Sequence, residues 1–451
     1  GATTDLKNIR IVMPGGTCSG NPFLHMASQA DCPAGATYES FVDRLAANRN
    51  AIIFNPDYLL FLRNFKVIRM MNLMESSLKD ICRSPSDPDC PADIGAWSHR
   101  AMMNDAVWGG NDGRTAAENH KGVPIEVMVA LANTLKRDIW VNMPHVATDD
   151  YVTEYAKYVY ANLESSIQVY VEYSNEVWNP GFAAHDYATA KGVSDGLDSV
   201  PGGFTNSPDR DANYFARLRY YSKRAEEIFA LWKTEFGGAS DTRVKRILGS
   251  FIGDRVLTEQ MLLNVTPSNI DAVAIAPYFY GCPYASACPN AAKNLLDATT
   301  VDDIFSIIDQ SSGDDVKALD GTIEAVKNQL TATNAHNLKL VTYEGGQHLV
   351  TGVINSLSNA DKPAKRKLFN DANRDPRMKE RYITFLNNWK GLVDDGATLF
   401  TLYTMPQSFY RFGNFGIKEH LNQARSDAPK YDGVMTFQET HGDCWWTGCN
   451  P

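Results

Sequence analysis

Short runs of apolar residues recur along the chain at intervals that suit strands alternating with helices. Each run is apolar on both faces and rich in Val, Ile and Tyr, which is typical of strands buried within a parallel sheet. Eight runs fit this pattern, at residues 9–13, 67–71, 139–143, 169–173, 244–251, 272–276, 338–343 and 398–403. The run at 51–54 competes with 9–13 for the place of the first strand.

Amphipathic helical patterns lie between these runs. The clearest covers residues 212–236, where Phe215, Leu218, Ala225 and Trp232 share one stripe. Similar patterns cover residues 123–136, 149–163, 322–333 and 376–389. Eight strand–helix units in succession, without a low-complexity linker, predict an α/β fold of the (β/α)8 barrel type rather than a doubly wound sheet.

The chain has 451 residues, more than the about 250 of a simple barrel. The surplus falls in segments that follow candidate strands, near 14–50, 72–122, 177–211, 278–320 and 345–375. In a barrel such loops gather at the C-terminal ends of the strands, where active sites form. We therefore expect a single catalytic domain over residues 1–451, with long loops on that face.

The charge balance disfavours some classes of function. The chain carries 43 basic and 53 acidic residues, a net charge of −10, and its pI is near 5.4. Such a chain is unsuited to binding phosphate backbones, so we expect no nucleic-acid partner. No stretch approaches the about 18 unbroken apolar residues of a membrane span, so we expect no membrane partner either.

The cysteines fall into four close pairs, each in a segment rich in Pro, Gly, Ser or Asp. The pairs are Cys18 with Cys32, Cys82 with Cys90, Cys282 with Cys288, and Cys444 with Cys449. Four local loop disulfides suit an oxidising compartment, which predicts a secreted, extracellular protein. A zinc site is less consistent with the sequence, because there is no Cys-x-x-Cys pair and no matching His spacing.

Two glutamates stand where predicted strands end. Glu176 follows Asn175 after the run at 169–173, and Glu344 follows the run at 338–343. On a barrel these two side chains would face each other across the mouth. Hydrolysis of a glycosidic bond needs such a pair, because one carboxylic acid protonates the leaving oxygen while the other, ionised, attacks the anomeric carbon.

At these motifs the sequence resembles the clan of retaining (β/α)8 glycoside hydrolases that includes many cellulases, mannanases and β-galactosidases. The resemblance implies that Glu176, after Asn175, is the acid/base on strand four and that Glu344 is the nucleophile on strand seven. It implies that Arg69 on strand two and Tyr278 on strand six hold the nucleophile. No cofactor and no metal is implied.

The resemblance extends over most of the chain, from strand two to strand eight. His145 matches, less specifically, a polar supporting position after strand three. The chain departs from the pattern at the end of strand eight, where Tyr403 stands in place of the Trp of many clan members. The resemblance indicates no single family within the clan, and so it does not indicate which sugar is the substrate.

Elementary electrostatics supports these roles. Glu176 must hold a proton near neutral pH, which desolvation or the charge of Glu344 would favour. Arg69 beside Glu344 would keep that carboxylate ionised. Asn175 can donate to a sugar 2-hydroxyl, a bond that strengthens in the transition state. Glu172, within the strand at 169–173, is expected to face the helix layer.

Several aromatic residues fall in predicted loops, where they are either substrate contacts or ordinary packing. Sugar rings have apolar faces that stack on aromatic side chains. We expect Trp178, Tyr280, Tyr403 and Trp108 to contact the substrate.

Together these features predict a secreted, monomeric, retaining endo-β-glycanase that acts on a polysaccharide or oligosaccharide. An exo-acting β-glycosidase on the same fold is one alternative. A catalytically inactive carbohydrate-binding protein on a degenerate hydrolase barrel is the other.

Overall fold

The computed structural model describes residues 11–76, 82–88, 90, 92–105, 108, 121–205, 207–442 and 445. Its centre is a six-stranded sheet in the order β10-β8-β7-β6-β5-β4, with every neighbouring pair parallel. The strands are β4 (Val67–Arg69), β5 (Asp138–Met143), β6 (Val169–Tyr173), β7 (Val244–Gly249), β8 (Ala272–Ile275) and β10 (Lys339–Thr342). They confirm six of the eight predicted strands and the predicted α/β barrel class.

The inner face of this sheet has its own core. Alternate residues point inward, so Val67, Trp140, Ile247, Ala274 and Val341 from five strands form one cluster. Leu399 and Tyr343 join the same cluster. Side chains from across the sheet can meet in this way only when the sheet curves around them, as in a barrel.

The eighth predicted strand is present as an irregular segment beside β10. Thr398 N–H donates to the Leu340 carbonyl at 2.8 Å, and Thr342 N–H donates to the Leu399 carbonyl at 3.0 Å. A single parallel bridge joins Leu340 and Ala397. Residues 397–401 therefore occupy the place of strand eight without forming a regular strand.

The first predicted strand is not formed by the described residues. Residues 11–13 and 51–54 lie in no strand, and Ile11 is 99% exposed; residues 9 and 10 lie outside the described part. Between the two runs the chain forms a sheet of its own. An apolar run becomes a strand only where a neighbour offers a matching ladder.

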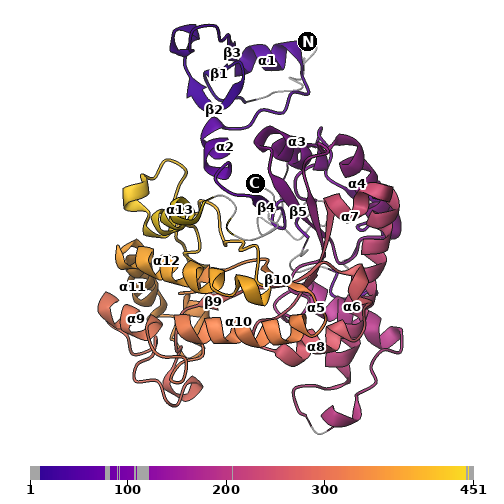
Figure 1. The fold of residues 1–451 in the computed structure, drawn as a ribbon, viewed down its shortest axis with the longest axis vertical. Helices are drawn as coiled ribbons and strands as arrows, with labels where there is room; N and C mark the ends of the chain where they lie inside the picture. Colours follow the sequence, from indigo (N-terminus) through magenta and orange to yellow (C-terminus); the bar gives the residue numbers. More distant parts are fainter. Residues whose placement is uncertain are drawn as a thin grey trace, which may run out of the picture.

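That separate sheet has the order β2-β1-β3 and is antiparallel. It contains β1 (Gly16–Cys18), β2 (Asn21–Met26) and β3 (Tyr38–Ser40), and α1 (Phe41–Ala47) and α2 (Pro56–Leu62) follow. Figure 1 shows the small sheet and α1 projecting from the rest of the molecule. The 14–50 segment, expected as a loop on the catalytic face, is thus a structured projection.

Helices cover the outside of the barrel sheet (Figure 1). They include α3 (Ile125–Leu135), α4 (Asp149–Asn162), α6 (Ala212–Phe236), α8 (Arg255–Leu262), α10 (Leu319–Asn334) and α12 (Arg377–Lys390), and the helical stretches predicted from the sequence are confirmed. The longest helix is α6. Asp211 caps its N-terminus by accepting a hydrogen bond from the Tyr214 N–H, and Gly237 is the residue at its C-terminal cap.

The remaining helices and strands lie in the long connections. They are α5 (Ala183–Ser194), α7 (Ser240–Arg243), α9 (Val301–Ile308), α11 (Lys362–Arg374), α13 (Pro429–His441), β9 (Tyr278–Phe279) and β11 (Gly346–Gln347). Strands β9 and β11 pair in parallel just beyond β8 and β10. This pairing fixes the two chain segments that carry Tyr278 and Glu344 side by side.

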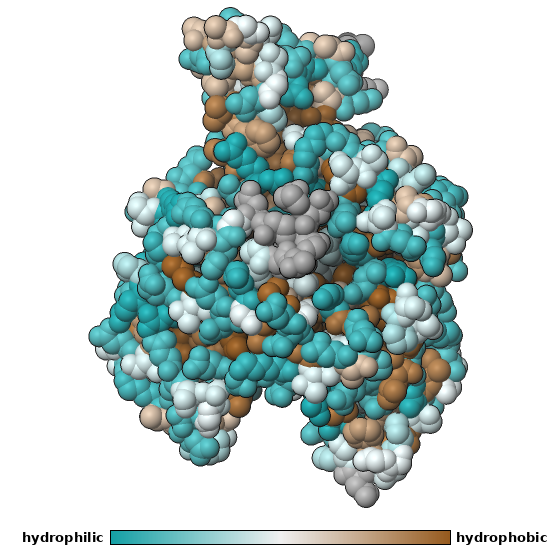
Figure 2. All heavy atoms as spheres, in the orientation of Figure 1, coloured by the Kyte–Doolittle hydropathy of each residue, from teal (hydrophilic) through white to brown (hydrophobic). Residues whose placement is uncertain are grey.

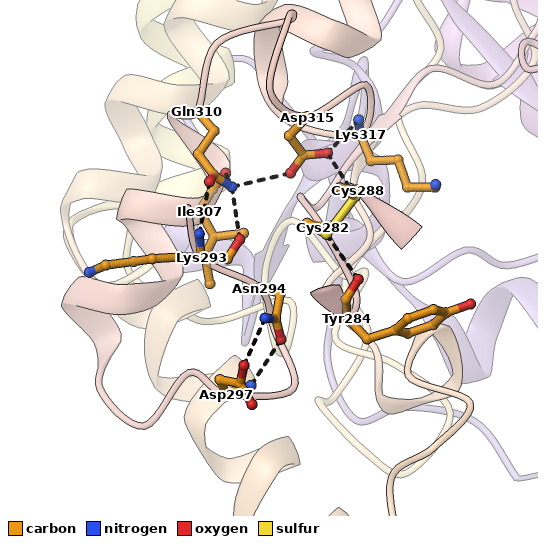
Figure 3. The surroundings of a disulfide bond; sticks show 10 residues. All are labelled: Cys282, Tyr284, Cys288, Lys293, Asn294, Asp297, Ile307, Gln310, Asp315 and Lys317. Atoms are coloured by element: carbon orange, nitrogen blue, oxygen red, sulfur yellow. Dashed lines mark hydrogen bonds between the residues drawn. A yellow bond between two sulfur atoms is a disulfide. The ribbon is translucent and has the colours of Figure 1, made fainter. Parts of the chain in front are cut away.

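Three of the four predicted disulfides are present, Cys18–Cys32, Cys82–Cys90 and Cys282–Cys288. Cys444 and Cys449 lie outside the described residues. Figure 3 shows the surroundings of the Cys282–Cys288 bond, where the Asp315 carboxylate accepts from the Lys317 N–H at 2.9 Å. The disulfide and this carboxylate together tie down the loop that follows β9.

The surface seen in Figure 2 is dominated by hydrophilic side chains, with apolar ones in small groups. None of the helices within the described ranges has the length and apolar character needed to cross a membrane. The connections after β6 and after β9 project as two lobes on one side of the molecule, with a notch between them (Figures 1 and 2).

Candidate active site

One arginine joins three strand ends at the centre of the site. Arg69, the last residue of β4, donates from Nη1 to Glu344 Oε1 at 3.1 Å and from Nη2 to Asn175 Oδ1 at 2.9 Å. The same Nη2 donates to Glu172 Oε2 at 2.9 Å. The guanidinium is nearly buried, so these charge-assisted bonds are poorly screened by water. Arg69 therefore fixes β4, β6 and β10 relative to one another.

Glu344 receives a second hydrogen bond from a neighbouring strand. Tyr278 Oη donates to Glu344 Oε2 at 2.8 Å, so both carboxylate oxygens are held. The residue is only 9% exposed. Burial raises the pKa of Glu344 to about 7; the Arg69 guanidinium opposes this shift and the negative charge of Glu176 adds to it.

Glu176 is held by a different pair of donors. Tyr343 Oη donates to Glu176 Oε1 at 2.9 Å, and Asn179 Nδ2 donates to Glu176 Oε2 at 2.8 Å. Burial raises the pKa of Glu176, and the bonds from Asn179 and Tyr343 oppose the rise. Because Tyr343 directly precedes Glu344 in the chain, the two glutamates belong to one connected site.

The turn that carries Glu176 has unusual backbone geometry. Ser174 has φ 60° and Glu176 has φ 44°, the left-handed region that non-glycine residues rarely adopt. The turn is held by the Ser174 N–H, which donates to the Met143 carbonyl at 2.7 Å, and by Asn142 Nδ2, which donates to the Ser174 carbonyl at 2.8 Å. Strain of this kind persists only where the surroundings enforce it, and it is concentrated at functional sites.

Glu172 lies inside the barrel, so its predicted orientation toward the helix layer is wrong. It is two residues after Tyr170, whose ring packs with the inner cluster, and alternate strand residues share a face. Its Oε2 accepts from Trp140 Nε1 at 2.8 Å and from Asn142 Nδ2 at 2.7 Å, in addition to Arg69. A buried carboxylate with these donors is part of the site.

His145 lies on the loop after β5, and its ring contacts the loop that carries the Cys82–Cys90 disulfide. Its Nε2 is 3.0 Å from the Cys82 carbonyl, and its ring packs edge-on against Tyr187. Burial lowers the pKa of His145 to about 4, so the ring is neutral near pH 7. Its predicted supporting role is therefore limited to bracing this loop.

The four aromatic residues that are predicted to contact the substrate lie in different surroundings. Tyr403 packs edge-on against Phe415. It also lines a cavity of about 550 Å³ together with Arg69, Tyr343 and Glu344. Burial and the nearby charge of Glu344 raise the pKa of Tyr403 to about 12.

The other three aromatic residues have different neighbours. Trp178 stacks on Phe251 with ring centroids 4.2 Å apart, two residues beyond Glu176. Tyr280 packs against His348, with ring centroids 5.6 Å apart. Trp108 is 40% exposed and donates to the Met102 carbonyl.

Besides Glu172, four residues of the site are not identified as such from the sequence: Trp140, Asn142, Asn179 and Tyr343. Trp140 and Tyr343 look like ordinary core residues, and each does pack in the inner cluster. For Asn142 a signal was present, because an amide side chain in a strand of buried residues requires a partner. Strand register supplies that partner, since Asn142 lies directly opposite Glu172.

Chemically, the arrangement holds three buried carboxyl groups, Glu344, Glu176 and Glu172, whose pKa values are raised by burial, beside the Arg69 guanidinium. Near neutral pH two desolvated carboxylates in one site favour retention of a proton. Glu344 and Glu176 therefore share a proton in this pH range. No group of three or more His, Cys, Asp or Glu side chains within the described ranges is arranged to hold a metal ion.

Neither a protein-family model nor a curated protein matches this chain. Among solved structures, the chain is similar to a GH51 arabinofuranosidase from Xanthomonas axonopodis pv. citri, at 12% identity and a TM-score of 0.41, over 87% of this chain and 64% of that one. It is similar to a Bacteroidetes-affiliated GH5 cellulase at 10% identity and a TM-score of 0.39, over 71% and 75%.

A third similar structure is the endo-1,4-β-D-mannanase from Thermotoga petrophila, at 12% identity and a TM-score of 0.30, over 82% of this chain and 98% of that one. All three are glycoside hydrolases, the group that the strand-end motifs resemble. This chain spans less than two thirds of the length of the arabinofuranosidase. The function proposed for it rests on the side chains of its own site.

Proposed function

We propose that this protein is a retaining glycoside hydrolase that cleaves β-glycosidic bonds within a polysaccharide. Glu344 is the nucleophile and Glu176 is the acid/base. The observation that carries the proposal is the pair of buried carboxyl groups held by separate donor sets, Arg69 and Tyr278 on Glu344, Tyr343 and Asn179 on Glu176.

In the first step, Glu176 gives its proton to the glycosidic oxygen as the bond from that oxygen to the anomeric carbon breaks. Glu344 attacks the same carbon and forms a glycosyl ester with inversion. The hydrogen bonds from Arg69 and Tyr278 stabilise the Glu344 carboxylate before attack. These bonds weaken as the carboxylate loses its negative charge in forming the ester.

In the second step, Glu176, now ionised, takes a proton from water as the water oxygen attacks the anomeric carbon. The ester bond to Glu344 breaks, and the second inversion restores the original configuration. Tyr343 can serve both states of Glu176, because its hydroxyl donates to the carboxylate and can accept from the carboxylic acid.

A polysaccharide substrate and endo action are supported by aromatic side chains beyond the reacting centre. Tyr410 is 44% and Phe412 is 60% exposed on the connection that follows Tyr403. Exposed aromatic faces suit stacking against sugar rings. The Tyr410 and Phe412 rings contact each other edge-on, with centroids 5.6 Å apart. We propose that a chain of sugars bound at Glu344 extends past Tyr403 to these two rings.

The three disulfides support an extracellular site of action. We further propose that the protein acts as a monomer.

A screen of β-glucans, β-mannans, xylans and β-galactans for released reducing ends tests the proposal. The wild-type protein should hydrolyse at least one of them, and Glu344→Gln and Glu176→Gln should each lose at least about 10³-fold in kcat/KM. Glu126→Gln, a change on α3 outside the site, is the matched control and should retain activity. Binding of a polysaccharide without hydrolysis would overturn the proposal.

A further inference from the structure

A third carboxylate lies within the site but takes no part in the proposed reaction. Glu172 is 1% exposed, and a single oxygen, Oε2, accepts four hydrogen bonds. They come from Arg69 Nη2 at 2.9 Å, Arg69 Nε at 3.2 Å, Trp140 Nε1 at 2.8 Å and Asn142 Nδ2 at 2.7 Å. Such a set of donors favours the ionised form, against the burial that raises the pKa of Glu172.

The other oxygen of Glu172, Oε1, lies beside Gly249 on β7. A Cβ added at Gly249 on β7 would lie 3.0 Å from Glu172 Oε1 and 3.3 Å from the Tyr221 hydroxyl. Tyr221 Oη in turn accepts from the Gly249 N–H at 2.7 Å. A side chain at residue 249 would therefore crowd this oxygen, and the neighbouring groups would have to shift by a few tenths of an ångström.

Arg69 has to serve two carboxylates. It directs Nε and Nη2 to Glu172 and Nη1 to Glu344, so its positive charge is divided between them. The charged and titratable groups that face Glu172 come from four places: Arg69 on β4, Glu176 after β6, Tyr221 on α6, and Tyr343 with Glu344 after β10. Arg69 is the one cation in this group.

We propose that Glu172 is a positioning residue, which fixes the Arg69 guanidinium in the plane that reaches Glu344 and Asn175. Its negative charge also offsets part of the positive charge that Arg69 presents to Glu344. The part of this inference that concerns turnover rests on the proposed function.

The electrostatics has a definite sign. The negative charge of Glu172 raises the pKa of Glu344 and that of Glu176, although burial is the largest cause for both. Glu172→Gln keeps the shape and an oxygen that can accept the same four bonds, but it removes the charge. Both pKa values should then fall, by on the order of one pH unit for charges that share one partner in a poorly solvated site.

The first test is the pH profile of kcat/KM on the polysaccharide that the wild-type protein hydrolyses. In Glu172→Gln, both limbs should move toward acid by on the order of one pH unit. Asp138→Asn is the matched control, because Asp138 is also a buried carboxylate on a central strand but pairs with Lys66 outside the site; its profile should keep its limbs in place. An unmoved Glu172→Gln profile, with or without lower activity, would refute the inference.

A second test does not depend on turnover. Protein labelled with ¹³C at the glutamate δ-carbons is titrated by NMR, with Glu344→Gln and Glu172→Gln used to assign the signals. The Glu344 signal should titrate at lower pH in Glu172→Gln than in the wild type. In the wild type, the Glu172 signal should have the shift of an ionised carboxylate at pH 7.

The two tests separate the two proposals. If no polysaccharide is cleaved but the Glu344 midpoint falls in Glu172→Gln, the proposed function fails and the positioning role stands. If turnover is found but Glu172 is protonated at pH 7, or the Glu344 midpoint does not move, the positioning role fails and the proposed function stands.

Discussion

Replacing Glu344 by Gln should make the protein more stable at neutral and alkaline pH while abolishing turnover. Burial raises the pKa of Glu344 from 4.5 to about 7, so the folded protein binds this proton more tightly than the unfolded chain. The stability that comes from this proton is fully present below about pH 4.5 and is lost as pH rises through about 7. Gln carries no charge at any pH and is free of this loss.

The size of the effect follows from that displacement. At about 1.4 kcal/mol for each pH unit, the wild-type protein loses up to about 3 kcal/mol of unfolding free energy between the two values. The difference between Glu344→Gln and wild type should therefore be close to its minimum near pH 5 and should grow by on the order of 3 kcal/mol by pH 8. Arg69 keeps Glu172 as a partner in the variant, so no cation is left unpaired.

Urea unfolding at fixed pH values between about 5 and 8 measures this difference directly. Glu154→Gln, at an exposed position on α4, is the control and should follow the wild type throughout. A Glu344→Gln variant whose stability falls in parallel with the wild type across this range would refute the reasoning, because it would mean that Glu344 is ionised without cost in the folded protein.

Three further outcomes follow from the structure. Tyr343→Phe removes a donor to Glu176, so kcat/KM should fall about 10–100-fold and its basic limb should move to higher pH, which a pH–rate profile measures. Replacing both Cys282 and Cys288 by Ser should cost about 2–3 kcal/mol in reversible unfolding or speed proteolysis of the loop after β9; unchanged protease resistance would contradict the bracing role. Replacing Tyr410 and Phe412 by Ala should raise KM for a polysaccharide several-fold but not KM for a short aryl glycoside, and equal effects on both would exclude a remote stacking role.

Much of the barrel could be predicted because buried parallel strands leave a strong local signal. Strands β4 to β8 and β10 lie where the apolar runs place them, and the motifs at their ends converge because parallel strands point the same way. Hydrogen bonds join Arg69, Asn175, Tyr278 and Glu344 in the structure. These residues are far apart in the sequence, and the fold brings them together.

The rest depended on information that a local pattern does not carry. The run at 9–13 has the composition of a strand, but which sheet a strand joins is decided by distant partners. Glu172 faces the inside of the barrel and not the helix layer, because alternate strand residues share a face and Tyr170 packs against the inner cluster. His145 has the chemistry of a site residue, but only the position of Cys82 determines what its ring contacts.

The central claim, that Glu344 attacks the anomeric carbon while Glu176 supplies the proton, is tested most directly by the configuration of the first product. Time-resolved ¹H NMR of the anomeric proton, recorded on the polysaccharide that the screen identifies, follows the product before mutarotation. A double displacement predicts that the β-anomer appears first. First appearance of the α-anomer, which would mean a single displacement by water, would contradict the assignment of Glu344 as the nucleophile.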